Sequence, residues 1–451
     1  EAIKPEFNAS DSFNPDAKRA KEFRESGFGT VLTHQPDGIA RGSGALVTLG
    51  EGKPNELFVK GKSSAHYSFS KGSSRQDYPS SQMGVIALLR QTYYDALWYA
   101  KAQPDLAELN LSLEAWNKLQ TIPQIFEVGD NLEALRADKI GDEFGIQYLF
   151  KGDGSEYQRL DEVKATGASF ILPLNFPDAY DVENPFDAMN VELSKMKHWE
   201  LAPSNPSLLV KAGMNIAFTA YGLKDMGQFT KNLRKAIKRG LSEEDALKAL
   251  TYNPANMLGV YNTVGSLEKG KLANFIISAK PIFDEKTTLH ENWINGKRFS
   301  VKMWNIADIT GTFNLNVAGV SYNLQVSGTP EMSKMSIKLA DTTKTIDPKH
   351  TLQDLGISLY FSTDKDSLNQ DKLGKGVVRL SGWVSPEDRS WKGSGTDANG
   401  KWIEWNATRT GDAPKKVEDD KDKAKNDSTA LQTDKPDDKD SKDPKKPEKP
   451  E

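Results

Sequence analysis

Residues 240–259 read GLSEEDALKALTYNPANMLG, and this stretch is the most informative about the fold. Ser242 precedes three acidic residues and then apolar residues at helical spacing, which predicts a helix with that serine as its N-cap. Asn253 and Pro254 predict the start of a second short helix, because proline is tolerated in a first helical turn. Gly259 is well placed to end it. We therefore expect two consecutive short helices here.

The segments that follow predict short strands. They read VGSLEKGKLANFII (264–277) and WINGKR (293–298). Glycine turns lead into the apolar run 273–277, which is typical of a buried strand. Asn295-Gly296 is the preferred dipeptide of a type I′ β-hairpin. Residues 265–300 should therefore form a small antiparallel element.

Upstream, from about residue 18 to residue 222, short β-branched or aliphatic runs alternate with longer amphipathic runs. Such alternation predicts repeated βα units and an α/β fold with a parallel sheet. The expected strands are 30–33, 124–128, 146–150, 169–174 and 215–219. The expected helices include 81–102, 132–144 and 228–239.

The arrangement in residues 240–298 resembles the end of the barrel in the amidohydrolase superfamily. There the last helices carry an "ALT-NPA-LG" pattern, and the chain returns through "GSLE-GK-AN" into a small β-sandwich. Weaker likeness extends upstream to about Phe23, through GFGTVLTH (27–34) and IPQIFEV (122–128). The resemblance implies a (β/α)8 TIM-like barrel over residues 1–264, incomplete at its N-terminus, and composite β-sandwich strands at 265–300 whose N-terminal partner strands are missing.

The same resemblance, which is to imidazolonepropionase-like metal-dependent hydrolases, implies hydrolysis of non-peptide, cyclic amide-like C–N bonds at a site holding one or two divalent metals. The expected ligands are a His-x-His pair, two further histidines on the fifth and sixth strands, and an aspartate on the eighth. The chain contains no His-x-His pair. The resemblance places Glu127 at the fifth-strand position, Lys151 at the sixth and Tyr221 near the eighth. An ammonium group repels metal and a neutral tyrosine is a poor ligand, so we predict no metal site.

Four residues are the candidate catalytic residues at the barrel mouth: Glu127, Lys151, His34 and Asp153. Three of them have a plainer interpretation to weigh against a catalytic one. Glu127 and Lys151 have opposite charges on neighbouring strands and can simply form an ion pair that replaces a lost metal. His34 closes an expected strand and can be bonded to nearby backbone. We predict no cofactor, and zinc or another divalent metal only if the domain is active.

After residue 301 the hydrophobic period changes to two, in 312–317, 322–326, 335–339 and 402–405. Alternation of this kind predicts an antiparallel β domain with one wet face, over residues 301–412. Its tryptophans 383, 391, 402 and 405 fit two interpretations. They can pack in the core or at an interface, or they can form a platform on which sugars stack.

Residues 413–451 consist mostly of Lys, Asp, Glu, Pro and Ser, which predicts a disordered charged linker or tail. The whole chain has 59 basic and 63 acidic side chains, which argues against nucleic acid as a partner. There is no cysteine and no apolar run of membrane-spanning length, so no membrane association is expected. The compartment stays undetermined, although a bacterial, exported or periplasmic protein is favoured over a cytoplasmic one.

Three functional hypotheses follow. The first is an amidohydrolase-like barrel that has lost its metal and serves a structural or regulatory role beside an active amidohydrolase domain or subunit, to which the tail would lead. The second is an active amidase or cyclic amidohydrolase that uses the barrel-mouth residues. The third is a glycan- or peptide-binding module in the tryptophan-rich β domain. The sequence specifies neither the substrate nor the oligomeric state.

Overall fold

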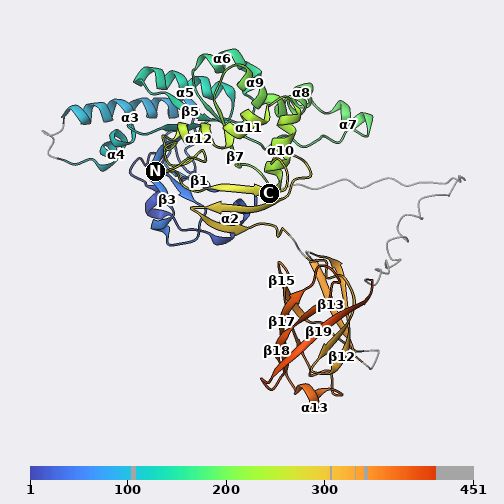
Figure 1. Ribbon diagram of the computed structural model, residues 1–451. Helices are drawn as coiled ribbons and strands as arrows, with labels where there is room; N and C mark the ends of the chain where they lie inside the picture. The colour runs from blue at the N-terminus through green and yellow to red at the C-terminus, as the bar shows by residue number, and fades with distance from the viewer. Residues whose placement is uncertain (103–107, 305–306, 331, 340–343, 413–451) are drawn as a thin grey trace, which may run out of the picture. The chain divides into compact units, whose positions relative to one another are not determined.

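The computed structural model describes residues 1–102, 108–304, 307–330, 332–339 and 344–412, and the chain forms two compact units, 1–303 and 304–451 (Figure 1). The expected tail, 413–451, lies outside the described residues. No helix in the described ranges is both long enough and apolar enough to cross a membrane.

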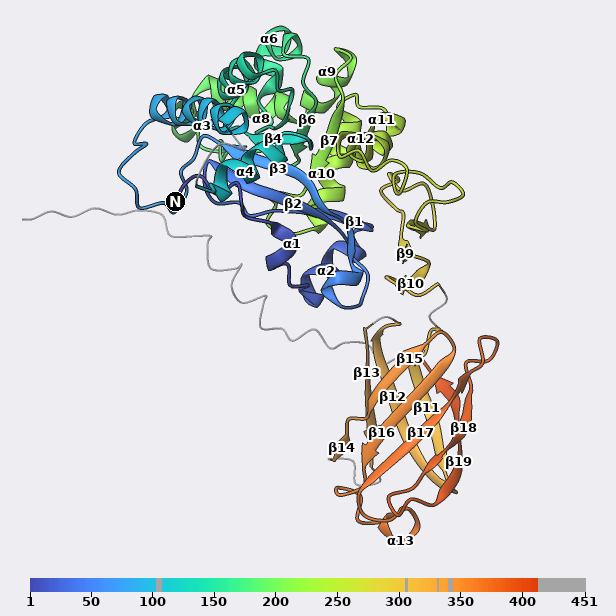
Figure 2. The same cartoon turned by 90° about the vertical axis from the view of Figure 1, so that its left-hand side faces the viewer.

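The first unit is built on a curled, mostly parallel sheet of seven strands, ordered as in the sequence (Figure 2). They are β1 (Thr30–Thr33), β2 (Ala40–Thr48), β3 (Phe58–Ser68), β4 (Gln124–Glu127), β5 (Tyr148–Lys151), β6 (Phe170–Pro173) and β7 (Ile216–Thr219). Strands β3 to β7 are parallel, whereas β1, β2 and β3 pair antiparallel. The α/β class is confirmed. The eight-stranded barrel is not, because the described sheet has five parallel strands and begins with an antiparallel segment.

Helices follow most of the parallel strands. The α-helices of this unit are α1 (Ala9–Ser12), α2 (Ala17–Glu25), α3 (Gln82–Ala102), α4 (Leu111–Leu119), α5 (Asn131–Phe144), α6 (Leu160–Ala165), α7 (Pro185–Met189), α8 (Leu193–Leu201), α9 (Asn205–Lys211), α10 (Gly227–Lys238), α11 (Glu243–Leu250) and α12 (Tyr252–Met257). The short 3-10 helices are η1 (Pro54–Glu56), η2 (Glu156–Arg159) and η3 (Ala202–Ser204).

The two faces of the parallel sheet have separate cores because side chains alternate along each strand. Phe126, Phe150 and Phe170 are register partners on β4, β5 and β6, all fully buried, and they pack in the larger core, to which α3 and α5 also contribute. The preceding residues of β4 and β5 face the other way. Ile125 and Leu149 pack in a smaller core together with residues of and just after α12. A residue two positions further along either strand therefore lies on this second face.

Strands β2 and β3 were not predicted, because their sequences look like polar loops. All nine residues of β2 are buried, although two are glycine and one is serine. Two buried hydroxyls in this region bond to backbone: Ser63 Oγ donates to the Gly44 carbonyl (3.0 Å) and Ser68 Oγ to the Gly38 carbonyl (3.0 Å). These two serines are therefore buried without a desolvation penalty for an unpaired hydroxyl.

The decisive segment 240–259 folds as predicted. The Ser242 hydroxyl accepts a hydrogen bond from the Asp245 backbone N–H (3.0 Å) and so caps α11. Gly259 follows α12 with a φ of +62°, a conformation that favours glycine. Beyond it, β8 (Phe275–Ser278), β9 (Leu289–Ile294) and β10 (Lys297–Ser300) form an antiparallel sheet. Asn295 and Gly296 both have positive φ, which confirms the type I′ hairpin.

The small sheet was expected to lack its N-terminal partner strands and to be left partly wet. The structure shows instead that the segment around α2 contacts it. Asn292 Nδ2 donates to the carbonyls of Arg24 (3.0 Å) and Phe28 (2.8 Å), and the Arg24 guanidinium lies 4.5 Å from the centre of the Phe299 ring. Part of the expected gap is therefore filled by an N-terminal helix.

The second unit is an antiparallel β domain of nine strands, ordered β14-β13-β12-β11-β19-β18-β17-β16-β15. They are β11 (Gly311–Val317), β12 (Val320–Thr329), β13 (Met332–Lys338), β14 (Thr345–Ile346), β15 (Lys349–Gln353), β16 (Gly356–Ser362), β17 (Val377–Val384), β18 (Trp391–Thr396) and β19 (Trp402–Gly411), with a short helix α13 (Gln370–Leu373). Alternate residues fill a single core. The predicted separate antiparallel domain is confirmed.

The N-terminal segment passes so close to β2 at Gly42 that a side chain there would collide with it. The φ of Gly42 is +74°, and a Cβ there would collide with the Phe7 carbonyl oxygen, in the segment that bridges to β2 at Ser43. We predict that Gly42→Ala lowers the free energy of unfolding by at least about 2 kcal/mol. The matched control is Gly61→Ala in β3, whose Cβ would make only ordinary contact with Ser10. Urea unfolding of both variants measures the difference, and equal losses would contradict the described N-terminal path.

Candidate functional site

Three charged side chains meet at the C-terminal ends of β4 and β5, and we call them the strand-end ion cluster: Arg41, Glu127 and Lys151. Glu127 and Lys151 are the last residues of β4 and β5 and are register partners, so their side chains start from adjacent points on the same face. Lys151 Nζ lies 3.1 Å from Glu127 Oε1, and Arg41 of β2 pairs with Glu127 Oε2. The predicted Glu127–Lys151 ion pair is confirmed.

Burial makes this cluster different from an ordinary surface ion pair. Arg41 is 5% exposed and Lys151 8%, while the Glu127 side chain keeps 23% of its surface. Arg41 is also held by a hydrogen bond from its Nε to the Gly38 carbonyl (2.9 Å). One carboxylate therefore accepts from two buried cations. Removing it would leave two like charges facing each other with little solvent to screen them.

Tyr221 covers the remaining side of Lys151. It lies two residues beyond β7, and its ring centre is 3.2 Å from Lys151 Nζ, a cation–π contact. The resemblance had placed Tyr221 near the position of the family's metal-binding aspartate. In the structure it contacts Lys151, which the resemblance had placed at another ligand position.

Two histidines stack beside the cluster. His34 follows β1 and His66 lies in β3, and their rings are parallel, with centres 3.9 Å apart. His34 Nδ1 lies 2.9 Å from the Gln35 carbonyl, which requires a proton on Nδ1, and His66 Nε2 lies 2.9 Å from Ser64 Oγ. His34 therefore has the backbone contact that the plainer interpretation expected. His66 was not singled out, because its strand was not predicted.

The electrostatics of the site follow from burial and from the two cations. Burial lowers the pKa of His66 well below its usual value, with further lowering by His34, Arg41 and Lys151. Burial likewise lowers the pKa of His34, aided by Arg41 and Lys151 against the opposing backbone bond to Gln35. Both imidazoles are therefore neutral at neutral pH.

The cluster itself shifts in a way that fits a carboxylate shared by two cations. Burial alone would raise the pKa of Glu127, but the hydrogen bond from Arg41 and the charge of Lys151 outweigh it and lower that pKa. The pKa of Lys151 is lowered by burial, which outweighs the attraction of Glu127, and Arg41 lowers it further. The Glu127 carboxylate is thus ionised, whereas burial disfavours the charged form of Lys151.

Asp153 organises the loop after β5. Its Oδ1 accepts hydrogen bonds from the Ser155 backbone N–H (3.0 Å) and the Ser155 hydroxyl (2.7 Å). The neighbouring Glu156 is almost fully buried and accepts from the N–H groups of Asp153 and Gly154 and from Asn205 Nδ2. Burial raises the pKa of Glu156 to about 6. Within the part of the chain that the structure describes, Asp153 has no recorded bond to the strand-end ion cluster, and its catalytic role stays a prediction.

The donor set at the strand ends does not suit a divalent metal. Across the described residues, no group of three or more His, Asp or Glu side chains is close enough to hold a metal ion. The one carboxylate of the strand-end ion cluster already accepts from a guanidinium and an ammonium, and cations of that kind repel a metal. The residues present therefore do not fit the metal centre that the resemblance implied.

Comparison with known proteins gives one family match and a set of structural neighbours. The sequence model of the amidohydrolase family matches residues 206–328, which runs beyond the first unit into β12. An amidohydrolase from Thermotoga maritima has a TM-score of 0.57 at 22% identity, over 66% of this chain and 79% of its own. A Xaa-Pro dipeptidase with bound methionine scores 0.32 at 18% identity, over 42% and 47% of the two chains. A. niger ochratoxinase scores 0.31 at 18% identity, over 42% and 44%.

No curated protein sequence matches the chain. The chain thus shares its fold with the Thermotoga protein, and residues 206–328 match the amidohydrolase family. The family match begins at residue 206, so it does not include the strands that carry Arg41, Glu127 and Lys151. The correspondence of Glu127 and Lys151 with ligand positions therefore stays a prediction from the resemblance.

A double-mutant cycle measures the coupling within the strand-end ion cluster. We expect Lys151→Met to lower the free energy of unfolding by about 2 kcal/mol, because it leaves a partly buried carboxylate with one partner. Glu127→Gln should cost at least as much, because two cations then face each other. The double variant should lose at least about 1 kcal/mol less free energy of unfolding than the sum of the two single losses.

The control for this cycle is Lys238→Met at the exposed Lys238–Glu285 pair, which should not change stability measurably. Urea unfolding gives all four values. Strictly additive losses for Glu127→Gln and Lys151→Met would show that the two charges do not interact, contrary to the geometry.

The buried neutral histidines predict a loss of stability in weak acid. The unfolded chain binds protons at histidine near pH 6.5, whereas folded His66, with its pKa lowered, does not. Stability should thus fall as pH drops below 6.5, by up to about 1.4 kcal/mol per pH unit for each such group. Glu156 and Asp138, whose pKa values are raised to about 6, act in the opposite direction.

Comparing His66→Gln with the unmodified protein cancels those opposing groups. The glutamine keeps a partner for Ser64 but does not titrate. The free energy of unfolding of the His66→Gln variant should therefore fall less between pH 7 and pH 5.5 than that of the unmodified chain. Parallel stability curves over this range would show that His66 is not buried in the neutral form.

Proposed function

We propose that the first unit is an amidohydrolase-superfamily domain without a hydrolytic metal centre, in which the strand-end ion cluster performs the structural job of the metal. The observation that carries this proposal is the position of the Lys151 ammonium. This group is buried, lies 3.1 Å from a Glu127 carboxylate oxygen and contacts the Tyr221 ring. A metal in a barrel of this family connects the ends of several strands through its ligands. Here ion pairs connect β2, β4 and β5 through Arg41, Glu127 and Lys151. The ring of Tyr221 adds the end of β7.

The role that fits such a domain is structural or regulatory, beside an active amidohydrolase domain or subunit. The surface of helix α3 favours the presence of a partner. It exposes Tyr94, Leu97 and Trp98, which lie along one stripe of the helix. Exposed apolar residues that gather in this way often mark an interaction surface. The α7–α8 segment exposes further large apolar side chains, Phe186, Met189 and Leu193 among them.

A second candidate function is hydrolysis of a C–N bond without the family's metal. The neutral imidazole of His34 favours it, since with Nδ1 bonded to the Gln35 carbonyl its Nε2 is free to accept a proton. In this function His34 would be the general base and Lys151 would stabilise the developing oxyanion. Hydrolysis of cyclic amides that His34→Gln abolishes, at an unchanged melting temperature, would favour this function over the structural one.

Zinc binding tests the leading proposal. Purified protein equilibrated with zinc and freed of unbound metal should retain far less than one zinc per chain, and zinc should leave its melting temperature unchanged. The positive control is the variant Lys151→His/Tyr221→Asp, which places two ligand types of the family beside Glu127. Zinc should raise the melting temperature of that variant only.

Elemental analysis of the same samples decides the result. Near-stoichiometric zinc in the unmodified protein, lost on Glu127→Gln, would overturn the proposal and favour a metal-dependent hydrolase. Glu127→Gln is informative here because a carboxamide is a much weaker zinc ligand than a carboxylate.

A further inference from the structure

The outer face of the second unit's sheet presents its side chains in three rows that cross neighbouring strands. Strand register defines each row. The first row is Trp383, Lys392, Asn406 and Asn316; the second is Ser358, Ser381, Ser394 and Glu404; the third is Tyr360, Arg379, Thr396 and Trp402. We call these three rows the outer-face platform.

Alternation along the strands separates the platform from the core. In β19, Ile403, Trp405 and Ala407 are buried, while Trp402, Glu404 and Asn406 are exposed. The four tryptophans considered above thus divide into two pairs. Trp391 and Trp405 are core residues, whereas Trp383 (67% exposed) and Trp402 (73% exposed) lie on the platform. Core packing is therefore confirmed for Trp391 and Trp405, whereas the sugar-stacking interpretation stays a prediction for Trp383 and Trp402.

The exposed aromatic residues flank a small, hydroxyl-bearing floor. The serine row lies between the row that contains Trp383 and the row that contains Tyr360 and Trp402. Ser358 Oγ and Ser381 Oγ are 3.4 Å apart within it. The two aromatic rows are four residues apart along each strand, which corresponds to about 13 Å. Short serine side chains thus separate the exposed aromatic residues of the first and third rows.

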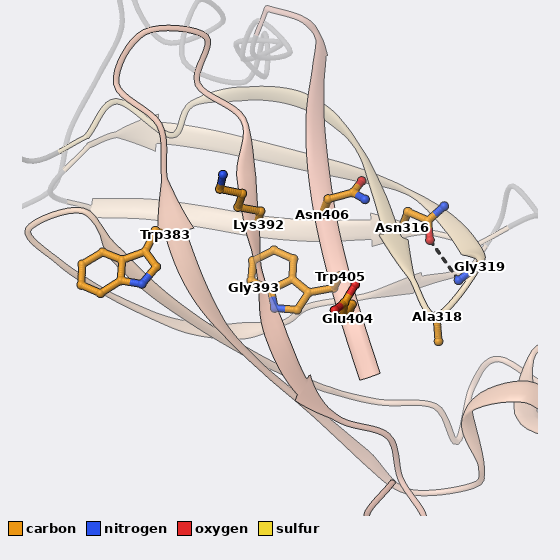
Figure 3. Close-up of a pocket in the computed structure, with 9 residues that line it drawn as sticks. All are labelled: Asn316, Ala318, Gly319, Trp383, Lys392, Gly393, Glu404, Trp405 and Asn406. Atoms are coloured by element: carbon orange, nitrogen blue, oxygen red, sulfur yellow. Dashed lines mark hydrogen bonds between the residues drawn. The ribbon is translucent and has the colours of Figure 1, made fainter. Parts of the chain in front are cut away.

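A hollow of about 670 Å³ opens at one side of the platform, lined by Trp383, Lys392, Gly393, Glu404 and Asn406 among others (Figure 3). Within the described residues, the side chains of Lys392, Glu404 and Asn406 make no recorded hydrogen bond or ion pair, and Trp383 makes no ring contact. The hollow thus combines one free aromatic face with a free cation, a free carboxylate and a free carboxamide.

We propose that the outer-face platform binds a neutral oligosaccharide. A pyranose ring presents axial C–H groups on one face, which pack on an indole face, and hydroxyls at its edge, which pair with carboxamide, carboxylate and ammonium groups. The platform offers both kinds of contact side by side. Its charges, Arg379, Lys392 and Glu404, are of mixed sign, so a polymer of a single charge gains little from it. The spacing of the aromatic rows suits a chain of sugars better than a single one.

The test uses the full chain and a panel of neutral glycans: hydroxyethyl cellulose, xylan, glucomannan, laminarin and chitin hexasaccharide. Affinity electrophoresis and tryptophan fluorescence measure binding. At least one glycan should bind, and Trp383→Ala should weaken that binding at least tenfold. Trp402→Ala should weaken it by a smaller factor. The control is Trp98→Ala on α3, an exposed tryptophan of the first unit, which should leave binding unchanged.

Both platform tryptophans are exposed, so their alanine variants should melt at the same temperature as the unmodified chain. Three results would overturn the proposal: no binding of any panel member at millimolar sugar concentration, binding that Trp383→Ala leaves unchanged, or platform-dependent binding of unglycosylated peptides from a peptide array. Because the platform lies in the second unit, these outcomes are independent of zinc binding in the first.

Discussion

The Glu127 carboxylate is held between two buried cations, and much of the first unit's site depends on this arrangement. Glu127 and Lys151 are brought together by parallel register alone, because both strands end at the same level. Arg41 then ties in β2, a strand that runs antiparallel to its neighbours. Tyr221 adds the end of β7 through its ring. Four separate strands are thus joined at one end of the sheet.

The charges of this cluster are arranged in the opposite way to those of a metal centre. A divalent metal needs several anionic or neutral donors around it, whereas here two cations surround one carboxylate. The neutral state of His34 and His66 follows from the same cause, since burial and the nearby positive charges both oppose their protonation. A partly buried carboxylate such as Glu127 is stabilised by nearby positive charge, and here Arg41 and Lys151 supply it.

Sequence reasoning predicted those parts of the structure that local physics controls. The parallel strands β4 to β7, the capped helix α11 and the Asn295-Gly296 hairpin each have a strong local signal. Strands β2 and β3 have none, because Gly42, Ser43 and Gly44 look like a turn, and only tertiary hydrogen bonds make their burial possible. The site was half predicted for this reason. Glu127 lies on a predicted strand and Lys151 directly follows one, whereas Arg41 and His66 lie on the two that were missed.

The central claim is that charged side chains, not a metal, join the ends of β4 and β5. A crystal structure of the protein grown with excess zinc, with anomalous data collected on both sides of the zinc absorption edge, tests it most directly. The account predicts no anomalous peak within coordination distance of Glu127 and a Lys151 Nζ that stays within ion-pair distance of its carboxylate. A zinc peak bound by Glu127, with Lys151 displaced from the carboxylate, would contradict it.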